Sequence, residues 1–266
     1  IDNINLSIDN ISTLKQFKGG SASLTFLAED YEKKFIRKTV SKKENISRGL
    51  LKLKNQFNYL KFLHKIDSNL TPFIYKDGED SKNYFYDLEY LNNFHTLDNS
   101  LVKDRKLFLK ILFKKLNNSI YKNKYKLNKI NWLQKHLNEK ILNKFEGFND
   151  STINKVIYDN NLLINNIKTI SVNQILENKN YNQFIIKHFS PKYLSFIHGD
   201  LTYENILVSK KNMDLRIIDC DSDFEYYPLE LDLGKLFQSS YLRYEKWDKN
   251  KRSLFYFNSI NDIKYN

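Results

Sequence analysis

The sequence predicts an α+β protein with a β-rich N-terminal lobe and a larger, mainly helical C-terminal lobe. Strand-like apolar runs fill residues 11–40, whereas residues 44–66 carry apolar residues at the three- and four-residue steps of an amphipathic helix. The helical pattern returns over about 98–190. We therefore expect two lobes, residues 1–91 and 92–266.

Four short runs in the N-terminal lobe predict strands because β-branched and aromatic residues are interrupted by polar turns. Two of them, on either side of the polar residues 29–32, form a hairpin signal. The last run is rich in tyrosine and phenylalanine and leads out of the lobe, where Asn92 and Asn93 end it. The expected strands are residues 11–17, 24–27, 35–40 and 84–91.

The C-terminal lobe is predicted from two helical stripes that start near Leu101 and Ile130. A short strand is expected at residues 169–172. Two further apolar runs, 206–208 and 215–218, predict strands joined by a polar turn. Polar residues flank both of these runs.

The composition excludes several classes of protein. The 266 residues include 43 Lys and Arg against 31 Asp and Glu, a net charge of +12, but the lysines are spread along the chain, so nucleic acid is not the expected partner. No apolar run is long enough to span a membrane, and no signal peptide is recognised, so we expect a cytoplasmic protein. A single cysteine, Cys220, excludes an internal disulfide. The missing initiator Met leaves fusion to another domain open.

The segment from Phe196 to Asp221 carries the clearest chemical signal. Asp200 is followed five residues later by Asn205, and Asp219 stands 14 residues further on. Asparagine and aspartate oxygens suit Mg²⁺, which takes one or two protein ligands in addition to substrate phosphates. A second carboxylate, such as that of Asp200, can orient or deprotonate an attacking hydroxyl. The spacing therefore favours metal-assisted phosphoryl transfer.

The motif His198-Gly-Asp-Leu-x-x-x-Asn-Ile-Leu, followed by Ile-Ile-Asp219, resembles the catalytic and metal-binding loops of the aminoglycoside phosphotransferase and choline kinase superfamily. These are small-molecule kinases with a two-lobed protein-kinase-like fold. The resemblance implies a nucleoside triphosphate, ATP, and Mg²⁺ as partners. It implies Asp200 as the catalytic carboxylate, His198 as the brace of its loop, Asn205 and Asp219 as metal ligands, and Asp232 as a later brace.

The same resemblance assigns nucleotide-binding positions in the N-terminal lobe. Lys38 corresponds to the lysine that reaches the phosphates, with Arg37 and Lys34 as rival assignments. The segment Gly19-Gly20-Ser21 would cover the triphosphate with backbone N–H groups. The positions that would pair with adenine are Glu89, Tyr90 and Leu91.

Some positions depart from the pattern or leave alternatives open. Gln56 stands where a glutamate is expected to pair with Lys38, so either Gln56 holds this lysine by a neutral hydrogen bond or Glu44 does so. Asp221 either assists a second Mg²⁺ or is only solvated. The acceptor can be a sugar, an amino alcohol, an aminoglycoside or a glycan precursor.

Three other functions stay open: a nucleotide-binding pseudoenzyme or regulatory module, a protein kinase, and a basic nucleic-acid binder. Gly199 stands where a protein kinase normally carries arginine, which favours small molecules.

Overall fold

The computed structural model describes residues 11–17, 23–31, 33–42, 47–126, 129–137, 139, 151–164, 166–221, 224–243, 255–259 and 262–265. The chain divides into two compact units. Unit 1 comprises residues 1–123 and 195–242, and unit 2 comprises residues 124–194 and 243–266. The predicted lobe boundary at residue 91 falls inside unit 1.

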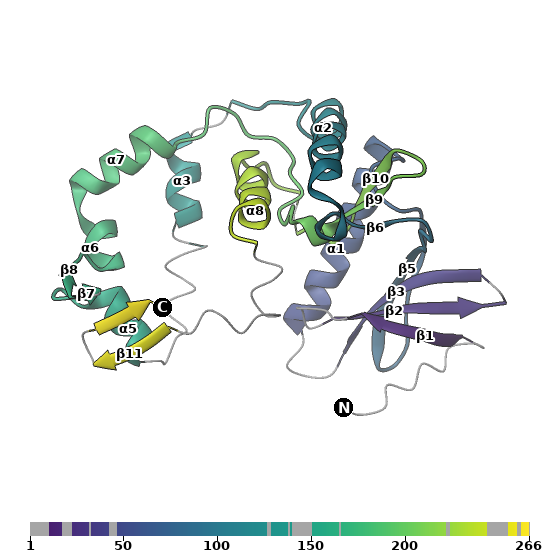
Figure 1. Ribbon diagram of the computed structural model, residues 1–266, viewed down its shortest axis with the longest axis horizontal. Coiled ribbons are helices and arrows are strands. Elements are labelled where there is room, and N and C mark those ends of the chain that lie inside the picture. Colours follow the sequence, from purple (N-terminus) through teal and green to yellow (C-terminus); the bar gives the residue numbers. More distant parts are fainter. Residues whose placement is uncertain are drawn as a thin grey trace. The chain divides into compact units, whose positions relative to one another are not determined.

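Unit 1 begins with a five-stranded antiparallel sheet in the order β1-β2-β3-β5-β4 (Figure 1). The strand β3 lies at its centre and pairs Lys38 with Thr25 on one side and Tyr86 on the other. The four predicted N-terminal strands are confirmed. The strands are β1 (Ser12–Phe17), β2 (Leu24–Asp30), β3 (Lys33–Ser41), β4 (Ile74–Glu79) and β5 (Asn83–Glu89).

The edge strand β4 has no counterpart among the predicted strands. Its sequence, Ile-Tyr-Lys-Asp-Gly-Glu, is largely polar because an edge strand has few buried positions. The turn into β5 is set by Asp80, whose carboxylate accepts hydrogen bonds from the backbone N–H groups of Lys82 and Asn83, both at 2.6 Å. Pairing with β5, not hydrophobic alternation, fixes this strand.

Helix α1 (Ser47–Ile66) confirms the predicted amphipathic helix and packs against β3. Its buried face includes Leu53, Phe57 and Leu60, which join Val40 and Tyr86 of the sheet in one hydrophobic core. The rings of Phe57 and Tyr86 stack with centroids 5.4 Å apart. This packing fixes α1 against the strand that carries Lys38.

The opposite side of β3 carries a buried ion pair. Arg37 donates two hydrogen bonds to Asp87 of β5, each at 2.8 Å, and its guanidinium lies 4.0 Å from the ring centroid of Phe85. Because side chains alternate along a strand, Arg37 and Lys38 point to opposite faces of the sheet. The ion pair between Arg37 and Asp87 therefore lies on the face of the sheet opposite to the side chain of Lys38.

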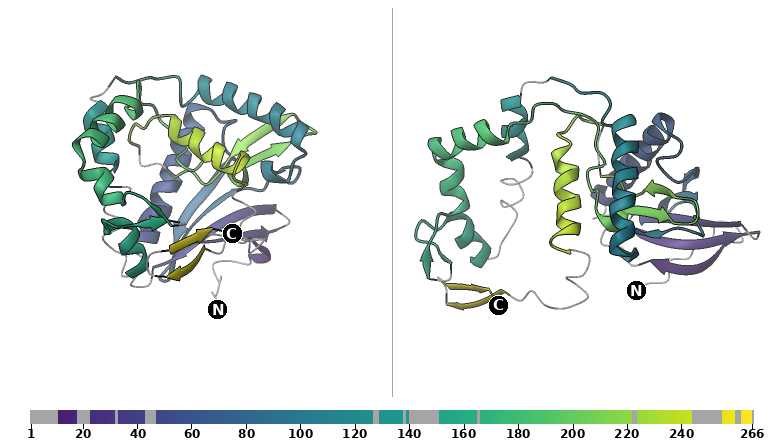
Figure 2. Two further views of the ribbon diagram at one scale, coloured as in Figure 1. Left: turned by 60° about the vertical axis from the view of Figure 1, so that its left-hand side comes forward. Right: turned by 45° about the horizontal axis from the view of Figure 1, so that its top comes forward.

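The remainder of unit 1 contains a three-stranded sheet in the order β10-β9-β6 and the helices around it (Figure 2). The strands β9 and β10 confirm the two runs predicted there. Helix α2 packs against β10, and α8 against the short helix η4. These elements are β6 (His95–Thr96), η2 (Leu97–Asn99), α2 (Val102–Asn118), η4 (Tyr203–Asn205), β9 (Ile206–Ser209), β10 (Asp214–Ile217) and α8 (Glu230–Ser240).

A polar network ties β10 to α2. Lys115 contacts the carboxylate of Asp214 at 2.8 Å, and Arg216 donates to the same carboxylate. Burial favours the neutral form of Asp214, but the hydrogen bonds from Lys115 and Arg216 outweigh burial and hold its pKa below the ordinary value of 3.8.

Unit 2 is mainly helical, with two small hairpins. The strand predicted near residues 169–172 is wrong: Ser171 is instead the N-cap of α6, because its side chain accepts from the N–H of Gln174 and Gln174 accepts from the N–H of Ser171. Ile141 and Leu142, predicted to continue the helix that starts near Ile130, lie outside the described residues. The elements are α3 (Lys129–Leu137), α5 (Ser151–Tyr158), β7 (Leu163–Ile164), β8 (Ile167–Lys168), α6 (Val172–Glu177), α7 (Lys179–Phe189), β11 (Phe255–Ser259) and β12 (Asp262–Tyr265).

In the described part of the chain, every helix is too short or too polar to cross a membrane.

Candidate active site

The loop that carries Asp200 is held by a fully buried carboxylate of α8. Asp232 accepts hydrogen bonds from the backbone N–H groups of His198 and Gly199, both at 2.8 Å, and from the hydroxyl of Tyr121 at 2.6 Å. Three donors satisfy the buried charge, and in return the carboxylate fixes two consecutive peptide units. The bracing role that the family resemblance implied for Asp232 is present in the geometry.

The buried ring of His198 connects the loop that carries Asp200 to the segment before Asp219. Its Nδ1 accepts from the backbone N–H of Asp200 at 3.2 Å, and its Nε2 lies 2.9 Å from the carbonyl oxygen of Ile218. Because an N–H can only donate and a carbonyl can only accept, the ring must be the neutral tautomer with its proton on Nε2. His198 thus fixes the backbone on both sides of the site.

Gly199 allows the two loops to approach each other closely. Its φ is +85°, and a Cβ built there would lie 2.2 Å from the carbonyl oxygen of Asp221. The backbone N–H of Asp221 donates to the carbonyl of His198 at 2.8 Å, so this approach is part of the hydrogen-bonded structure. A side chain cannot be accommodated at position 199 without moving the backbone.

A row of hydrogen-bonded groups connects the predicted catalytic and metal-binding residues Asp200, Asn205 and Asp219. The amide nitrogen of Asn205 lies 3.0 Å from Oδ2 of Asp200, and the backbone N–H of Ile218 donates to the carbonyl of Asn205 at 3.0 Å. Asp219 follows directly and adopts a φ of 58°, which residues other than glycine rarely adopt. Strain of this kind persists where the surrounding contacts enforce it, commonly at functional sites.

Lys38 reaches this row from β3. Its ammonium lies 2.8 Å from Oδ1 of Asp219 and 3.0 Å from Oε1 of Gln56, and the Lys38 side chain is buried. The hydroxyl of Tyr86 also donates to Oε1 of Gln56, at 3.2 Å. The amide nitrogen of Gln56 donates to the carbonyl of Cys220 at 3.0 Å. Gln56 therefore holds the lysine by a neutral hydrogen bond and anchors the Asp219 segment at the same time.

The buried surroundings of the contact between Lys38 and Asp219 keep two neighbouring titratable side chains neutral. Burial, reinforced by the charge of Asp219, raises the pKa of Tyr86 and of Cys220 well above their ordinary values. Cys220 is consequently a packed, protonated thiol and not a nucleophile.

The rival assignments for the lysine can be compared directly. Arg37 is committed to Asp87 on the other face of the sheet, and Lys34 is exposed. Glu44, the rival to Gln56, lies outside the described residues, as does the whole predicted phosphate-covering segment Gly19-Gly20-Ser21. Of the three cations, only Lys38 contacts Asp219.

Asp221 points its carboxylate toward α1. Its two oxygens lie 3.2 and 3.3 Å from the ammonium of Lys52, and both side chains are about half exposed. Whether Asp221 also assists a metal stays a prediction.

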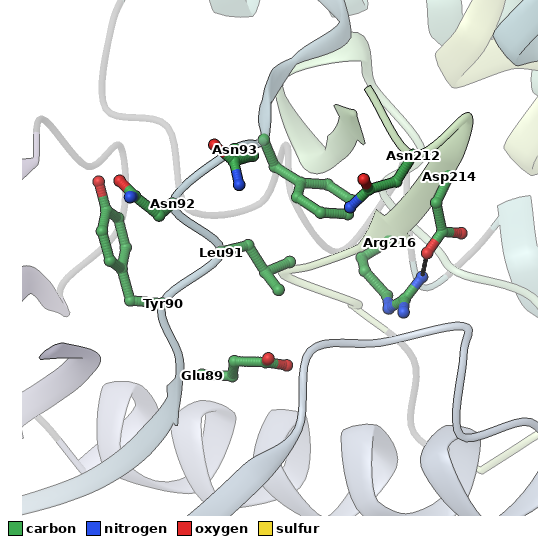
Figure 3. A pocket seen from close by; sticks show the side chains of 9 residues that line it. Glu89, Tyr90, Leu91, Asn92, Asn93, Asn212, Asp214 and Arg216 are labelled. Carbon is green, nitrogen blue, oxygen red and sulfur yellow. Dashed lines mark hydrogen bonds and ion pairs between the residues drawn. The ribbon is translucent and has the colours of Figure 1, made fainter. Parts of the chain in front are cut away.

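The segment after β5 lines a pocket of about 270 Å³ together with β10 and the turn before it (Figure 3). Glu89 and Leu91 face this pocket, whereas the ring of Tyr90 points away from the side chain of Arg216. Within the described residues, no backbone hydrogen bond from the N–H of Tyr90 or Leu91 is seen. Neither Lys38 nor Asp200 lines this pocket.

One residue of the site was not found from the sequence. The ammonium of Lys235, on α8, lies 3.0 Å from Oδ1 of Asp200. The available signal was its position three residues after Asp232, which places both side chains on neighbouring parts of one helix surface.

Comparison with solved structures shows the same fold in small-molecule kinases. A putative fructosamine-3-kinase from Haemophilus somnus 129PT has a TM-score of 0.50 at 16% identity, over 90% of this chain and 76% of that one. A thermostable mutant of aminoglycoside phosphotransferase APH(4)-Ia, in its apo form, has a TM-score of 0.59 at 11% identity, over 91% and 80%. No protein-family model and no curated protein matches the sequence. These likenesses confirm the predicted α+β, kinase-like fold.

Proposed function

We propose that the chain transfers the γ-phosphoryl group of ATP to a hydroxyl group of a small molecule. The observation that carries this proposal is the row of contacts from Lys38 to Asp219 at 2.8 Å and from Asn205 to Asp200 at 3.0 Å. It combines a buried cation, two hard oxygen ligands and a partly exposed carboxylate, which are the groups that phosphoryl transfer uses. The kinase fold supports the same reaction class.

Each group has one role in this proposal. Lys38 contacts the α- and β-phosphates, and the backbone of residues 89–91 pairs with the adenine. The segment Gly19-Gly20-Ser21 covers the triphosphate. Asp200 orients the acceptor hydroxyl and accepts its proton, so that the oxygen can attack phosphorus. His198 acts by holding this loop.

The donor set suits Mg²⁺. Asn205 uses its amide nitrogen on Asp200, and Asp219 uses Oδ1 on Lys38, which leaves an amide oxygen and Oδ2 as hard ligands. No group of three or more His, Cys, Asp or Glu side chains in the described residues could hold a metal. Mg²⁺ takes one or two protein ligands and completes its coordination with substrate phosphates and water. Bound there, Mg²⁺ would neutralise phosphate charge.

Two features count against the alternatives. Gln56 and Asp219 hold Lys38 and leave one of its three N–H donors for a phosphate, so the absence of glutamate is no reason to expect an inactive protein. Gly199 requires a positive φ and leaves no room for a side chain, so the arginine of a protein kinase cannot stand there.

A thermal-shift screen with Mg-ATP, Mg-GTP and Mg-CTP tests nucleotide binding, since a ligand of the native state raises Tm. Phosphate-transfer assays on sugars, amino alcohols and aminoglycosides then identify the acceptor. We expect Asp200→Asn to lower kcat by orders of magnitude and to preserve the ATP shift, and Asp219→Ala to reduce that shift. Asp104→Asn, which alters an ion-paired aspartate on α2, is the control. No shift with any nucleotide would refute the proposal.

A further inference from the structure

We propose that Lys235 is a further catalytic residue, which contacts the transferring phosphoryl group at the acceptor end of the site. The inference rests on the proposed function, because it assigns a role inside the same reaction.

The backbone positions of Lys235 and Asp200 are linked through one residue. Both depend on Asp232 of α8: this carboxylate binds the loop before Asp200, and Lys235 lies three residues further along the same helix. The Lys235 ammonium lies 3.0 Å from Oδ1 of Asp200, while Asn205 occupies Oδ2. The carboxylate is therefore held from both sides, by one group of its own loop and by one cation of α8.

The ammonium of Lys235 has capacity for a ligand. It carries three N–H donors, and the ion pair with Asp200 is its only polar contact within the described residues. The side chains of Lys235 and Asp200 are 40% and 36% exposed, so both can be reached from solvent. Lys38, in contrast, is buried against Asp219 and Gln56.

The geometry brings this cation to the reacting atoms. A hydroxyl bound to Asp200 lies about 2.6–3.2 Å from its carboxylate, and in a reactive complex the phosphorus lies about 3–3.5 Å from that hydroxyl. A cation in contact with the same carboxylate can therefore reach the equatorial oxygens of the γ-phosphoryl group.

In the step itself, the acceptor oxygen forms a bond to the γ-phosphorus while the bond from that phosphorus to the β,γ-bridging oxygen breaks, and its electron pair leaves on ADP. The hydroxyl proton passes to Asp200. Lys235 keeps its proton and donates hydrogen bonds to the equatorial oxygens, where charge accumulates in the transition state.

Mg-ADP with aluminium fluoride is the probe, because this pair imitates the planar phosphoryl group. We expect wild-type protein to show a larger rise in Tm with Mg-ADP plus aluminium fluoride than with Mg-ADP alone. Lys235→Met should lose this increment and keep the Mg-ADP shift, and Lys235→Arg should retain part of it. Lys210→Met, which removes the lysine of an ion pair with Asp104, should behave as wild type.

Turnover gives a second readout, with phosphate release from Mg-ATP measured with water as the acceptor. Lys235→Met should lower kcat by about 10²–10³-fold, the effect of removing one donor to developing charge, with KM for ATP unchanged. An aluminium fluoride increment that survives in Lys235→Met, or is missing in wild type, would overturn the role of Lys235. Failure of Mg-ADP and Mg-ATP to shift Tm at all would instead refute the proposed function.

Discussion

Replacing Gln56 with leucine tests the neutral anchor of Lys38. The side chain of Gln56 is 7% exposed and makes three hydrogen bonds: from the ammonium of Lys38, from the hydroxyl of Tyr86 and to the carbonyl of Cys220. Leucine has a similar volume but can form none of them. The substitution therefore isolates the polar contacts from the packing of α1.

The expected loss follows from the groups left behind. The Tyr86 hydroxyl and the Cys220 carbonyl would each lose a buried partner, at a cost of about 1–3 kcal/mol apiece. Lys38 would keep its contact with Asp219 at 2.8 Å. The free energy lost at Lys38 is therefore smaller than that lost at Tyr86 or at Cys220. Part of the total is offset by the apolar surface that leucine buries, which leaves a net loss of about 3 kcal/mol.

Denaturant unfolding followed by circular dichroism measures this loss as a change in the free energy of unfolding. Gln16→Leu, at an exposed position of β1, is the matched control and should change stability by about 0.5 kcal/mol or less. The Mg-ATP thermal shift of Gln56→Leu should also fall, because Lys38 loses one of its two partners. A loss of stability below about 1 kcal/mol would show that Gln56 is not the anchor inferred from these contacts.

Three other substitutions test separate parts of the structure. Gly199→Ala should lower stability by at least about 1–3 kcal/mol, measured by denaturant unfolding, because the added Cβ would lie 2.2 Å from the carbonyl oxygen of Asp221; near-native stability would contradict the loop geometry. Asp87→Leu should cost about 3–5 kcal/mol because it leaves buried Arg37 unpaired, whereas the double variant with Arg37→Met should recover most of this loss; a double variant as unstable as the single one would refute this. The lowered pKa of Asp214 predicts stability that is complete above about pH 4 and is lost as pH falls through its folded pKa; an unchanged pH dependence of Tm in Asp214→Asn would contradict it.

The parts of the structure that could be predicted from the sequence are those where local pattern and tertiary role agree. The strands β2, β3 and β5 lie inside the sheet, and each contains a run of aromatic and aliphatic residues that is visible in the sequence. The segment from His198 to Asp219 is recognisable because its polar residues stand at fixed spacing on either side of two strand-like runs, β9 and β10. A residue with both local and long-range contacts, such as Asp200, can still be identified from its local sequence pattern.

The missed features depend on partners that are distant in sequence or on competing local chemistry. The strand β4 is set by its pairing with β5, and Ser171 was placed in a strand although its side chain caps a helix. Lys235 resembles any surface lysine until the fold brings it to a residue 35 positions earlier. In each case the deciding interaction is absent from the local periodicity.

The contacts of Gln56 give a physical reason for glutamine at this position, which could not be inferred from the sequence pattern. A glutamate there could accept from Lys38 and Tyr86, but it could not donate to the carbonyl of Cys220, which needs the amide N–H. Asp219 already balances the charge of Lys38 at 2.8 Å, so a second carboxylate would leave an uncompensated negative charge in a buried site. The amide keeps this pair neutral, and the negative charge of a bound nucleotide would then be met by Lys38 and by the metal that Asn205 and Asp219 are proposed to hold.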